Sequence, residues 1–255
     1  MLELLTSFFY IFLYQPLFNG LILLCQHIPG QDFGIAVIVL TVVVRLVIYP
    51  LSTKGIKAQK ELAELQPKMK EIQDKFKDNK EKQAKAMMEL YQKERVNPLS
   101  GCLPLLIQLP IIIAVYRVFL TFKEGLSIEE LNALYSFVNY SNNLSTSFLG
   151  FIELTEPFWR LAILVGVLQF FQTKMLTPKQ NLQKSTGKQD TMAQFSNMMQ
   201  KQMLYFFPFF IVLMLWGLPS VVALYLLVFT LFSIIQQHFT LKMKEIQPPS
   251  LKKND

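Results

Sequence analysis

Five apolar blocks separated by polar stretches dominate the pattern along the chain. They cover residues 33–50, 101–122, 158–176, 203–216 and 218–237. A helix needs about 20 residues to cross about 30 Å of hydrocarbon, so most of these blocks are long enough to span a bilayer. The fourth block is short, and a short span thins the bilayer locally. We therefore predict an all-α membrane protein with five transmembrane helices.

Lysine and arginine are distributed unevenly among the polar segments. Residues 51–100 carry twelve of them and 177–202 and 238–255 carry four each, whereas 123–157 has one against five acids. Cytoplasmic loops carry an excess of these residues, which places the three basic segments in the cytoplasm and 123–157 outside. Five spans with a cytoplasmic C-terminus then require the N-terminal residues 1–32 to lie outside.

The first 32 residues are apolar enough to span, yet a helical wheel gives them a narrow polar stripe. Gln15, Asn19 and Gln26 fall within about 40° of one another at about 100° per residue. Such a stripe, with aromatic residues around it, is typical of a helix in the membrane interface. We therefore expect residues 1–32 to form an outer interfacial amphipathic helix, with a spanning helix as the alternative. A signal peptide is disfavoured because a basic n-region is missing.

The polar stretch 51–100 has a helical repeat. Spacings that alternate between three and four residues form the seam of a coiled coil. The seam consists of Ala58, Leu62, Leu65, Met69, Ile72 and Phe76 and, after a polar turn at 78–80, Ala84, Met87 and Tyr91. We predict a cytoplasmic antiparallel helical hairpin that is kinked at Pro67. It is either a solvated spacer or a basic arm that docks on lipid headgroups, ribosomal RNA or an incoming chain.

Composition excludes several classes of protein. With 52% apolar residues and a mean hydropathy of +0.32, the chain fits neither a disordered protein nor an ordinary soluble enzyme. The net charge of +7 suggests anionic lipid or RNA as a neighbour. The predicted topology separates Cys25 from Cys102, and His27 and His238 lack ligand spacing, so we expect neither a disulfide nor a metal site. We find no catalytic motif and no pair of intramembrane acids, and therefore expect no enzyme activity and no cofactor.

Arg45 is the most distinctive residue of the first span. It follows a largely apolar run, residues 34–44, which contains no acid that could pair with it. An arginine deep in a membrane helix costs at least about 2.5–3.5 kcal/mol, so it normally faces water, a partner or a substrate. Thr41 lies one turn away on the same face, which favours a polar surface. The alternative is that Arg45, four residues before Tyr49, snorkels to the cytoplasmic headgroups.

The other spans carry polar residues as well. Gln108 lies in the second span, and Tyr225, Ser233 and Gln236 fall within about 80° of one another on the fifth. Each of them by itself is more often a helix–helix contact than a site. Together they predict a partly polar interior whose only deep charge is positive and open towards the cytoplasm.

Four segments, in this order and spacing, resemble YidC-type membrane protein insertases. They are TVVVRLVIYPL at 41–51, ELQP at 64–67, NPLSGCLPLLIQLPI at 97–111, and LPS at 218–220 followed by SIIQQ at 233–237. The resemblance covers about residues 9–241 and is closest to the short forms, which lack a large extracytoplasmic domain. The chain departs from the family at Val221 and Val222, where a glycine is often found.

The resemblance implies a hydrophilic groove that is open to the cytoplasm and to the lipid and closed on the outer side. Arg45 would be its positive residue, lined by Thr41, Gln108, Trp216 and Tyr225, and Gln236 on the helix of Tyr225 completes our candidate set. The clients would be nascent membrane proteins, with no small-molecule substrate. The hairpin would help to recruit them, and the basic tail would contact the ribosome. We expect a multi-pass protein of the bacterial cell membrane, with anionic lipids and the Sec translocon as further partners.

Two other functions are compatible with the residues. A lone buried arginine can bind an anion, as in a small transporter or channel, but we find no internal repeat of the kind that transporters contain. An assembly chaperone that works only beside the Sec translocon is the second alternative.

Overall fold

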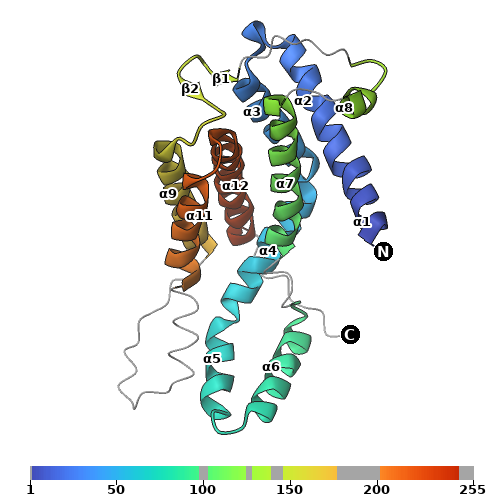
Figure 1. The fold of residues 1–255 in the computed structure, drawn as a ribbon. Helices are drawn as coiled ribbons and strands as arrows, with labels where there is room; N and C mark the ends of the chain where they lie inside the picture. The colour runs from blue at the N-terminus through green and yellow to red at the C-terminus, as the bar shows by residue number, and fades with distance from the viewer. Residues whose placement is uncertain (1, 98–102, 125–127, 139–145, 177–201, 247–255) are drawn as a thin grey trace. The chain divides into compact units, whose positions relative to one another are not determined.

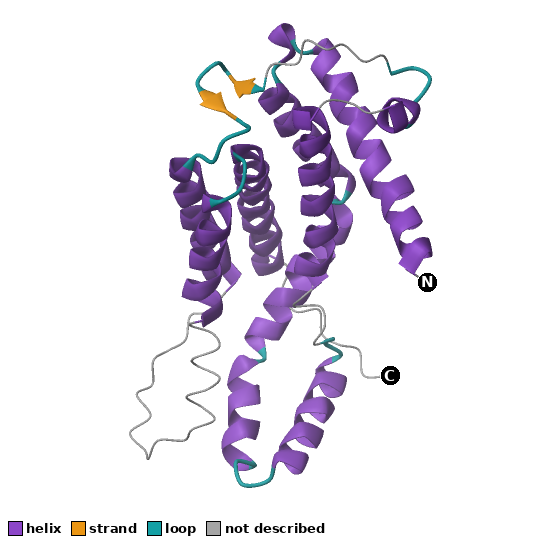
Figure 2. Ribbon diagram, viewed as in Figure 1, coloured by secondary structure: helices purple, strands orange, loops and turns teal. Residues whose placement is uncertain are grey.

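The computed structural model describes residues 2–97, 103–124, 128–138, 146–176 and 202–246. The chain divides into two compact units, which we describe one at a time. The first comprises Met1–Ile48, Leu105–Leu168 and Phe210–Phe232, and the second comprises Tyr49–Pro104, Gln169–Phe209 and Ser233–Asp255. Apart from one short strand pair, the described elements are helical, as Figure 2 shows. The prediction of a mainly helical membrane protein is therefore confirmed.

The first unit begins with a long helical rod. It consists of α1 (Leu2–Phe9), a π-helical turn (Tyr10–Tyr14) and α2 (Gln15–His27), which continue one another in Figure 1. After a 3-10 turn (Pro29–Gln31), α3 (Phe33–Val47) begins at Asp32, whose carboxylate accepts a hydrogen bond from Ile35 N at 3.0 Å. A side-chain acceptor at this position satisfies one of the free amides of the first helical turn.

Two residues of the polar stripe on α2, Gln15 and Asn19, hydrogen-bond another part of the chain. The Asn19 side chain is buried, where it donates to Ala133 O at 3.1 Å and accepts from Tyr135 N at 2.7 Å, and Gln15 also donates to Ala133 O. These two residues therefore bind a segment more than 100 residues further along the chain, and the placement of the helix in the interface remains a prediction. By length and composition, Thr6–His27 could cross a membrane.

The later helices of the chain are those that the apolar blocks predicted, with shifted ends, except for the short α8 (Ile128–Asn132), which lies in the predicted loop 123–157. They are α7 (Leu103–Glu124), α8, α9 (Trp159–Leu176), a π-helical turn (Gln202–Phe206) that leads into α11 (Phe207–Trp216), and α12 (Ser220–Ile246). Among the described helices, Thr6–His27 and Ser220–Lys242 are long and apolar enough to span a bilayer, and a third span results if α3 and α4 (Tyr49–Glu64) count as one broken span. The count of five spans remains a prediction.

A short antiparallel strand pair interrupts the all-α pattern. Strands β1 (Ser147–Phe148) and β2 (Ile152–Glu153) are joined by a turn in which Phe151 N donates to Phe148 O at 3.0 Å. Both central residues of this turn, Leu149 and Gly150, have positive φ, as in a type I′ turn, which matches the twist of paired strands. Our prediction of an all-α protein missed this pair, because two-residue strands leave no alternating pattern.

We call residues 146–156 the strap, because this segment contacts the N-termini of two helices. Asp32, at the start of α3, accepts from Leu149 N at 2.6 Å. At the start of α12, Ser220 N and Val221 N donate to the carbonyl oxygens of Glu156 and Leu154 at 3.0 and 3.3 Å. The strap thus satisfies free amides at the start of α12 and donates to the capping carboxylate at the start of α3, which holds the beginnings of both helices in one unit.

The strap has one acid whose ionisation matters. Burial by itself would raise the pKa of Glu153, but hydrogen bonds from Thr146 and Thr155 outweigh that effect and hold the pKa below its usual value. A lowered pKa stabilises the fold where the carboxyl is ionised, and this contribution disappears as the pH falls through the lowered pKa.

Replacing Glu153 by glutamine should therefore lower the thermal midpoint of the purified protein at pH 7, and this difference should shrink as the pH falls through the lowered pKa of Glu153. Thermal melts of both proteins over a series of pH values from neutral to acidic measure this difference. Equal midpoints at every pH would show that the carboxylate contributes nothing to the strap.

In the second unit, α5 (Gln66–Lys75) and α6 (Lys80–Glu94) lie side by side (Figure 1). Lys68 Nζ lies 2.6 Å from Glu94 Oε1, and the Tyr91 hydroxyl donates to Met69 Sδ at 3.7 Å. Burial raises the pKa of Tyr91. A break at Leu65 separates α4 from α5, and Pro67 lies in the first turn of α5. The break occurs here because a proline within a helix removes a hydrogen bond.

The seam of α6 differs from our prediction by one position. Ala84 is exposed, and the preceding residue Gln83 is buried instead, where it donates to Gln73 O at 3.3 Å. A side-chain amide that hydrogen-bonds the facing helix can take the place of a small apolar side chain in the seam. The apolar spacing alone did not reveal this exchange.

Candidate functional site

The buried cation of the first unit is Arg45, on the last turn of α3. It lies in an otherwise apolar helix, and only 5% of its surface is exposed. Its guanidinium carbon lies 4.0 Å from the ring centroid of Phe229 and 5.2 Å from that of Phe232, and Nη2 donates to Phe229 O at 3.3 Å. The side chain therefore points to α12, and it does not extend into solvent as a snorkelling side chain would.

A second contact joins α7 to α12. Gln108 Nε2 donates to the Tyr225 hydroxyl at 2.8 Å, and both side chains are buried. Tyr225 lies one helical turn before Phe229, and the two rings are 6.0 Å apart. Gln108, Tyr225, Phe229 and Arg45 thus form a continuous series of contacts across α7, α12 and α3. The structure brings together three of the residues that we predicted, Arg45, Gln108 and Tyr225.

Thr41 lies one turn before Arg45 but is bonded to its own helix. Its hydroxyl donates to Val37 O at 2.6 Å, and the side chain is buried. Together with Tyr225 it contributes to the wall of a pocket. Thr41 thus lies beside the candidate site, and its hydroxyl proton is donated to its own helix.

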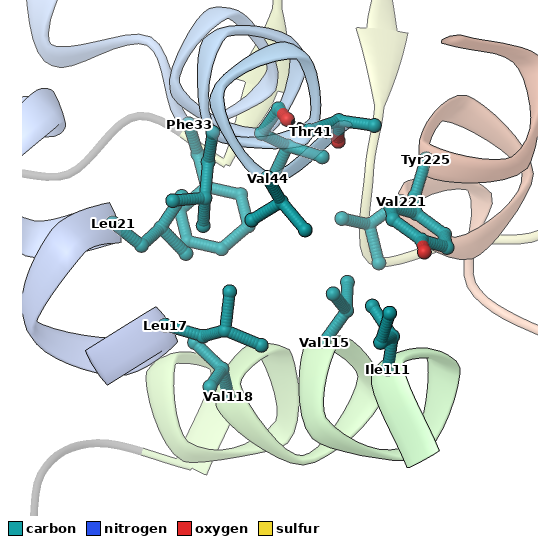
Figure 3. Close-up of a pocket in the computed structure, with 12 residues that line it drawn as sticks. Leu17, Leu21, Phe33, Thr41, Val44, Ile111, Val115, Val118, Val221 and Tyr225 are labelled. Atoms are coloured by element: carbon teal, nitrogen blue, oxygen red, sulfur yellow. Dashed lines mark hydrogen bonds between the residues drawn. The ribbon is translucent and has the colours of Figure 1, made fainter. Parts of the chain in front are cut away.

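The pocket is formed by α2, α3, α7 and α12, and its wall is mostly aliphatic (Figure 3). Thr41 and Tyr225 are its polar residues, and Arg45 is not part of the lining. Val221, where the sequence departs from the family pattern, lies in this wall, and both Val221 and Val222 are buried. The valines therefore pack in the core. The described pocket is apolar and differs in character from the hydrophilic groove that we predicted.

Two predicted residues lie apart from this series of contacts. Trp216, at the end of α11, is 55% exposed, and its ring stacks on that of Trp159 at 6.4 Å. Gln236 belongs to the second unit, where its Nε2 donates to Tyr49 O, Ser52 Oγ and Thr53 Oγ1 at 3.1, 3.2 and 2.9 Å. Gln236 therefore connects α12 to α4 through hydrogen bonds, as polar residues commonly do between membrane helices.

Phe229 and Phe232 are the residues of the site that the sequence analysis missed. They follow Tyr225 at spacings of four and three residues, which places all three on one face of α12. That spacing is the signal that could have found them. Phenylalanine in a membrane helix usually contacts lipid, which is why this spacing does not stand out.

Comparisons with known proteins identify the family. The family model described as "60Kd inner membrane protein" matches residues 24–247. A protein of Fusobacterium nucleatum named membrane protein insertase YidC is 31% identical over 212 residues, which cover 83% of this chain and 87% of the relative. Proteins of the same name from Anaeromyxobacter sp. (strain K) and Geobacter sulfurreducens are 37% and 33% identical over 86% and 84% of this chain.

The chain belongs to the 60Kd inner membrane protein family, and the resemblance to YidC-type insertases that its motifs predicted is confirmed. It spans about a third of the length of the Anaeromyxobacter and Geobacter relatives, 34% in both cases. The fold and the comparisons together define a membrane protein of this family.

Proposed function

We propose that this protein is a membrane protein insertase and chaperone, without enzymatic activity. It moves short hydrophilic segments of nascent membrane proteins across the bilayer and releases their transmembrane helices into lipid. The observation that carries the proposal is the buried Arg45, held against α12 in a chain whose relatives are named insertases. An arginine in this position is costly, and a functional role explains why the helix contains it.

The main barrier to insertion is the loss of water from the hydrophilic segment. Each backbone polar group that enters hydrocarbon without a partner costs several kcal/mol. A groove that admits water part of the way from the cytoplasm shortens the dry path. We assign this groove to the face that carries Arg45 and Gln108, with Tyr225 and Thr41 beside them. Trp216, at the end of α11 in the same unit, would lie along the route of the client.

Arg45 would attract acidic residues in the N-terminal tail of the client. Opposite charges attract more strongly where the dielectric constant is low than they do in water. This capture must be weak, because the client has to leave again. The hydrophobic helix of the client then remains in the bilayer, since burial of its apolar surface favours that state.

The proposed topology follows from the distribution of lysine and arginine. Residues 1–32 and the strap lie outside, and the α5–α6 pair and the basic tail lie in the cytoplasm. There the pair would recruit clients and touch anionic headgroups, and the tail would contact the ribosome. The Sec translocon is a further partner in this proposal, and the location is the bacterial cell membrane.

Insertion by the purified protein tests the proposal. The protein in liposomes receives a single-span client with a short acidic N-tail, and protease protection scores insertion. We expect protection well above that of empty liposomes. Equal protection would contradict autonomous insertion; recovery on addition of the Sec translocon would then indicate a partner-dependent chaperone, and Arg45-dependent anion uptake would indicate a transporter.

A further inference from the structure

We propose that Phe229 and Phe232 are positioning residues that hold the guanidinium of Arg45 for the client. The inference rests on the proposed function and adds two residues to its machinery. The guanidinium carbon lies 4.0 and 5.2 Å from the two ring centroids, both within the range of a cation–π contact. Because Phe229 also supplies the carbonyl that accepts from Nη2, one residue contacts the guanidinium through both its ring and its backbone.

An aromatic ring is suited to holding a cation that must also bind a passing carboxylate. A carboxylate binds a guanidinium in the guanidinium plane, often through two parallel N–H···O bonds. A ring instead attracts the cation from above that plane, through its electron-rich face. Phe229 and Phe232 can therefore stabilise the buried charge without competing for the edge that a client carboxylate would take. An acidic residue in their place would compete directly.

Contacts with Tyr225 in turn hold the Phe229 ring in place. Its ring is 6.0 Å from that of Tyr225, and the Tyr225 hydroxyl accepts a hydrogen bond from Gln108 at 2.8 Å. The bond to α7 restricts the Tyr225 ring, which packs against Phe229 from the side of the preceding turn. Arg45 is thus held by a series of side chains that reaches back to α7. Preorganisation of this kind reduces the entropy that is lost when the client binds.

The first test measures insertion against client concentration for native protein, Phe229→Leu and Phe229→Tyr. Leucine keeps an apolar side chain but has no π face. We expect Phe229→Leu to raise the half-saturating concentration of an acidic-tailed client about three- to tenfold. Phe229→Tyr should restore the native value, and a client with a neutral tail should be unaffected. Phe232→Leu should have a smaller effect, because its ring is further away.

Phe239→Leu is the matched control. Phe239 lies on the same helix and is 57% exposed, and its ring contacts that of the neighbouring His238. This variant should insert both clients as the native protein does. Three outcomes would overturn the proposal: native behaviour of Phe229→Leu, an equal loss for acidic and neutral clients, or failure of Phe229→Tyr to rescue.

A second measurement is independent of insertion. Phenylglyoxal modifies accessible arginine side chains, and mass spectrometry of the peptide that contains Arg45 gives the rate. We expect Phe229→Leu to increase this rate about threefold or more over the native protein and Phe239→Leu to leave it unchanged, since a weaker contact exposes the guanidinium more often. An unchanged rate in Phe229→Leu would overturn the positioning role.

The two measurements separate failure of this inference from failure of the proposed function. If the native protein does not insert, or if Arg45→Ala inserts as well as native, the proposed function fails. If insertion depends on Arg45 but Phe229→Leu changes neither the half-saturating concentration nor the modification rate, only the positioning role fails.

Discussion

Replacing Arg45 by alanine should reduce insertion of a client with an acidic N-tail about tenfold, and replacement by lysine should preserve most of it. The estimate of about tenfold corresponds to about 1.4 kcal/mol, the lower end of what a hydrogen bond to a charged group contributes. Lysine keeps the charge, but it lacks the planar fork of arginine and stacks less well on Phe229. Its expected activity is therefore between those of the native and alanine proteins. Protease protection in liposomes gives all three values.

The thermal stability of Arg45→Ala should not fall with its insertion activity. A charge buried at 5% exposure is costly, so Arg45→Ala should melt at the same temperature as the native protein or higher. A protein that is as stable as native but inserts poorly has lost a functional group. If Arg45→Ala instead unfolds at a lower temperature and inserts normally, Arg45 is a structural anchor and our proposal for this residue is wrong.

The second large effect is expected at Gly34, near the start of α3. A Cβ atom at this position would lie 2.5 Å from Cδ2 and 2.8 Å from Cβ of Phe148 in the strap. Because the Cβ of Phe148 is fixed to the backbone, rotation of the ring cannot relieve the contact, and α3 or the strap has to move. We expect Gly34→Ala to lower the free energy of unfolding by about 1–3 kcal/mol, as overpacking of a core does.

Gly20→Ala is the matched control, within α2 of the same unit. Its added Cβ would meet Cδ1 of Leu40 at 3.3 Å, and that flexible methyl group can move. Alanine is also favoured over glycine in a helix by about 1 kcal/mol, so the control should melt at or above the native temperature. Thermal melts in detergent compare the two variants. If both melt alike, the contact between α3 and the strap is not tight in solution.

Long apolar blocks were the most reliable signal in the sequence. The start of α3 at Phe33 and the body of α12 follow directly from them, because a buried or lipid-facing helix must be apolar over its length. Contacts between residues far apart in the chain could not be predicted from the sequence. The polar residues of α2 suggest a water-facing stripe, but Asn19 accepts a hydrogen bond from Tyr135 N. The sequence around neither residue indicates the other.

The site was predicted in part for the same reason. Arg45, Gln108 and Tyr225 could be found individually, since a polar residue in an apolar helix is conspicuous. The spacing of Phe229 places it on the helix face of Tyr225, but its role depends on the cation that α3 places against it. The strap was missed because its turn and two-residue strands carry no periodic pattern. Sequence patterns indicate which residues are unusual for their element, and the fold determines which of them meet.

The most direct test of the central claim is the coupling between Arg45 and the charge of the client. Insertion is measured in liposomes for native and Arg45→Ala protein, each with an acidic-tailed client and with the same client whose tail acids are changed to amides. Such a cycle isolates the pairwise contribution. We predict that Arg45→Ala reduces insertion of the acidic client about tenfold and of the amide client by less than about twofold, in keeping with a charge-assisted contact. Equal losses for the two clients, or no loss for either, would contradict the claim that Arg45 receives the acidic tail.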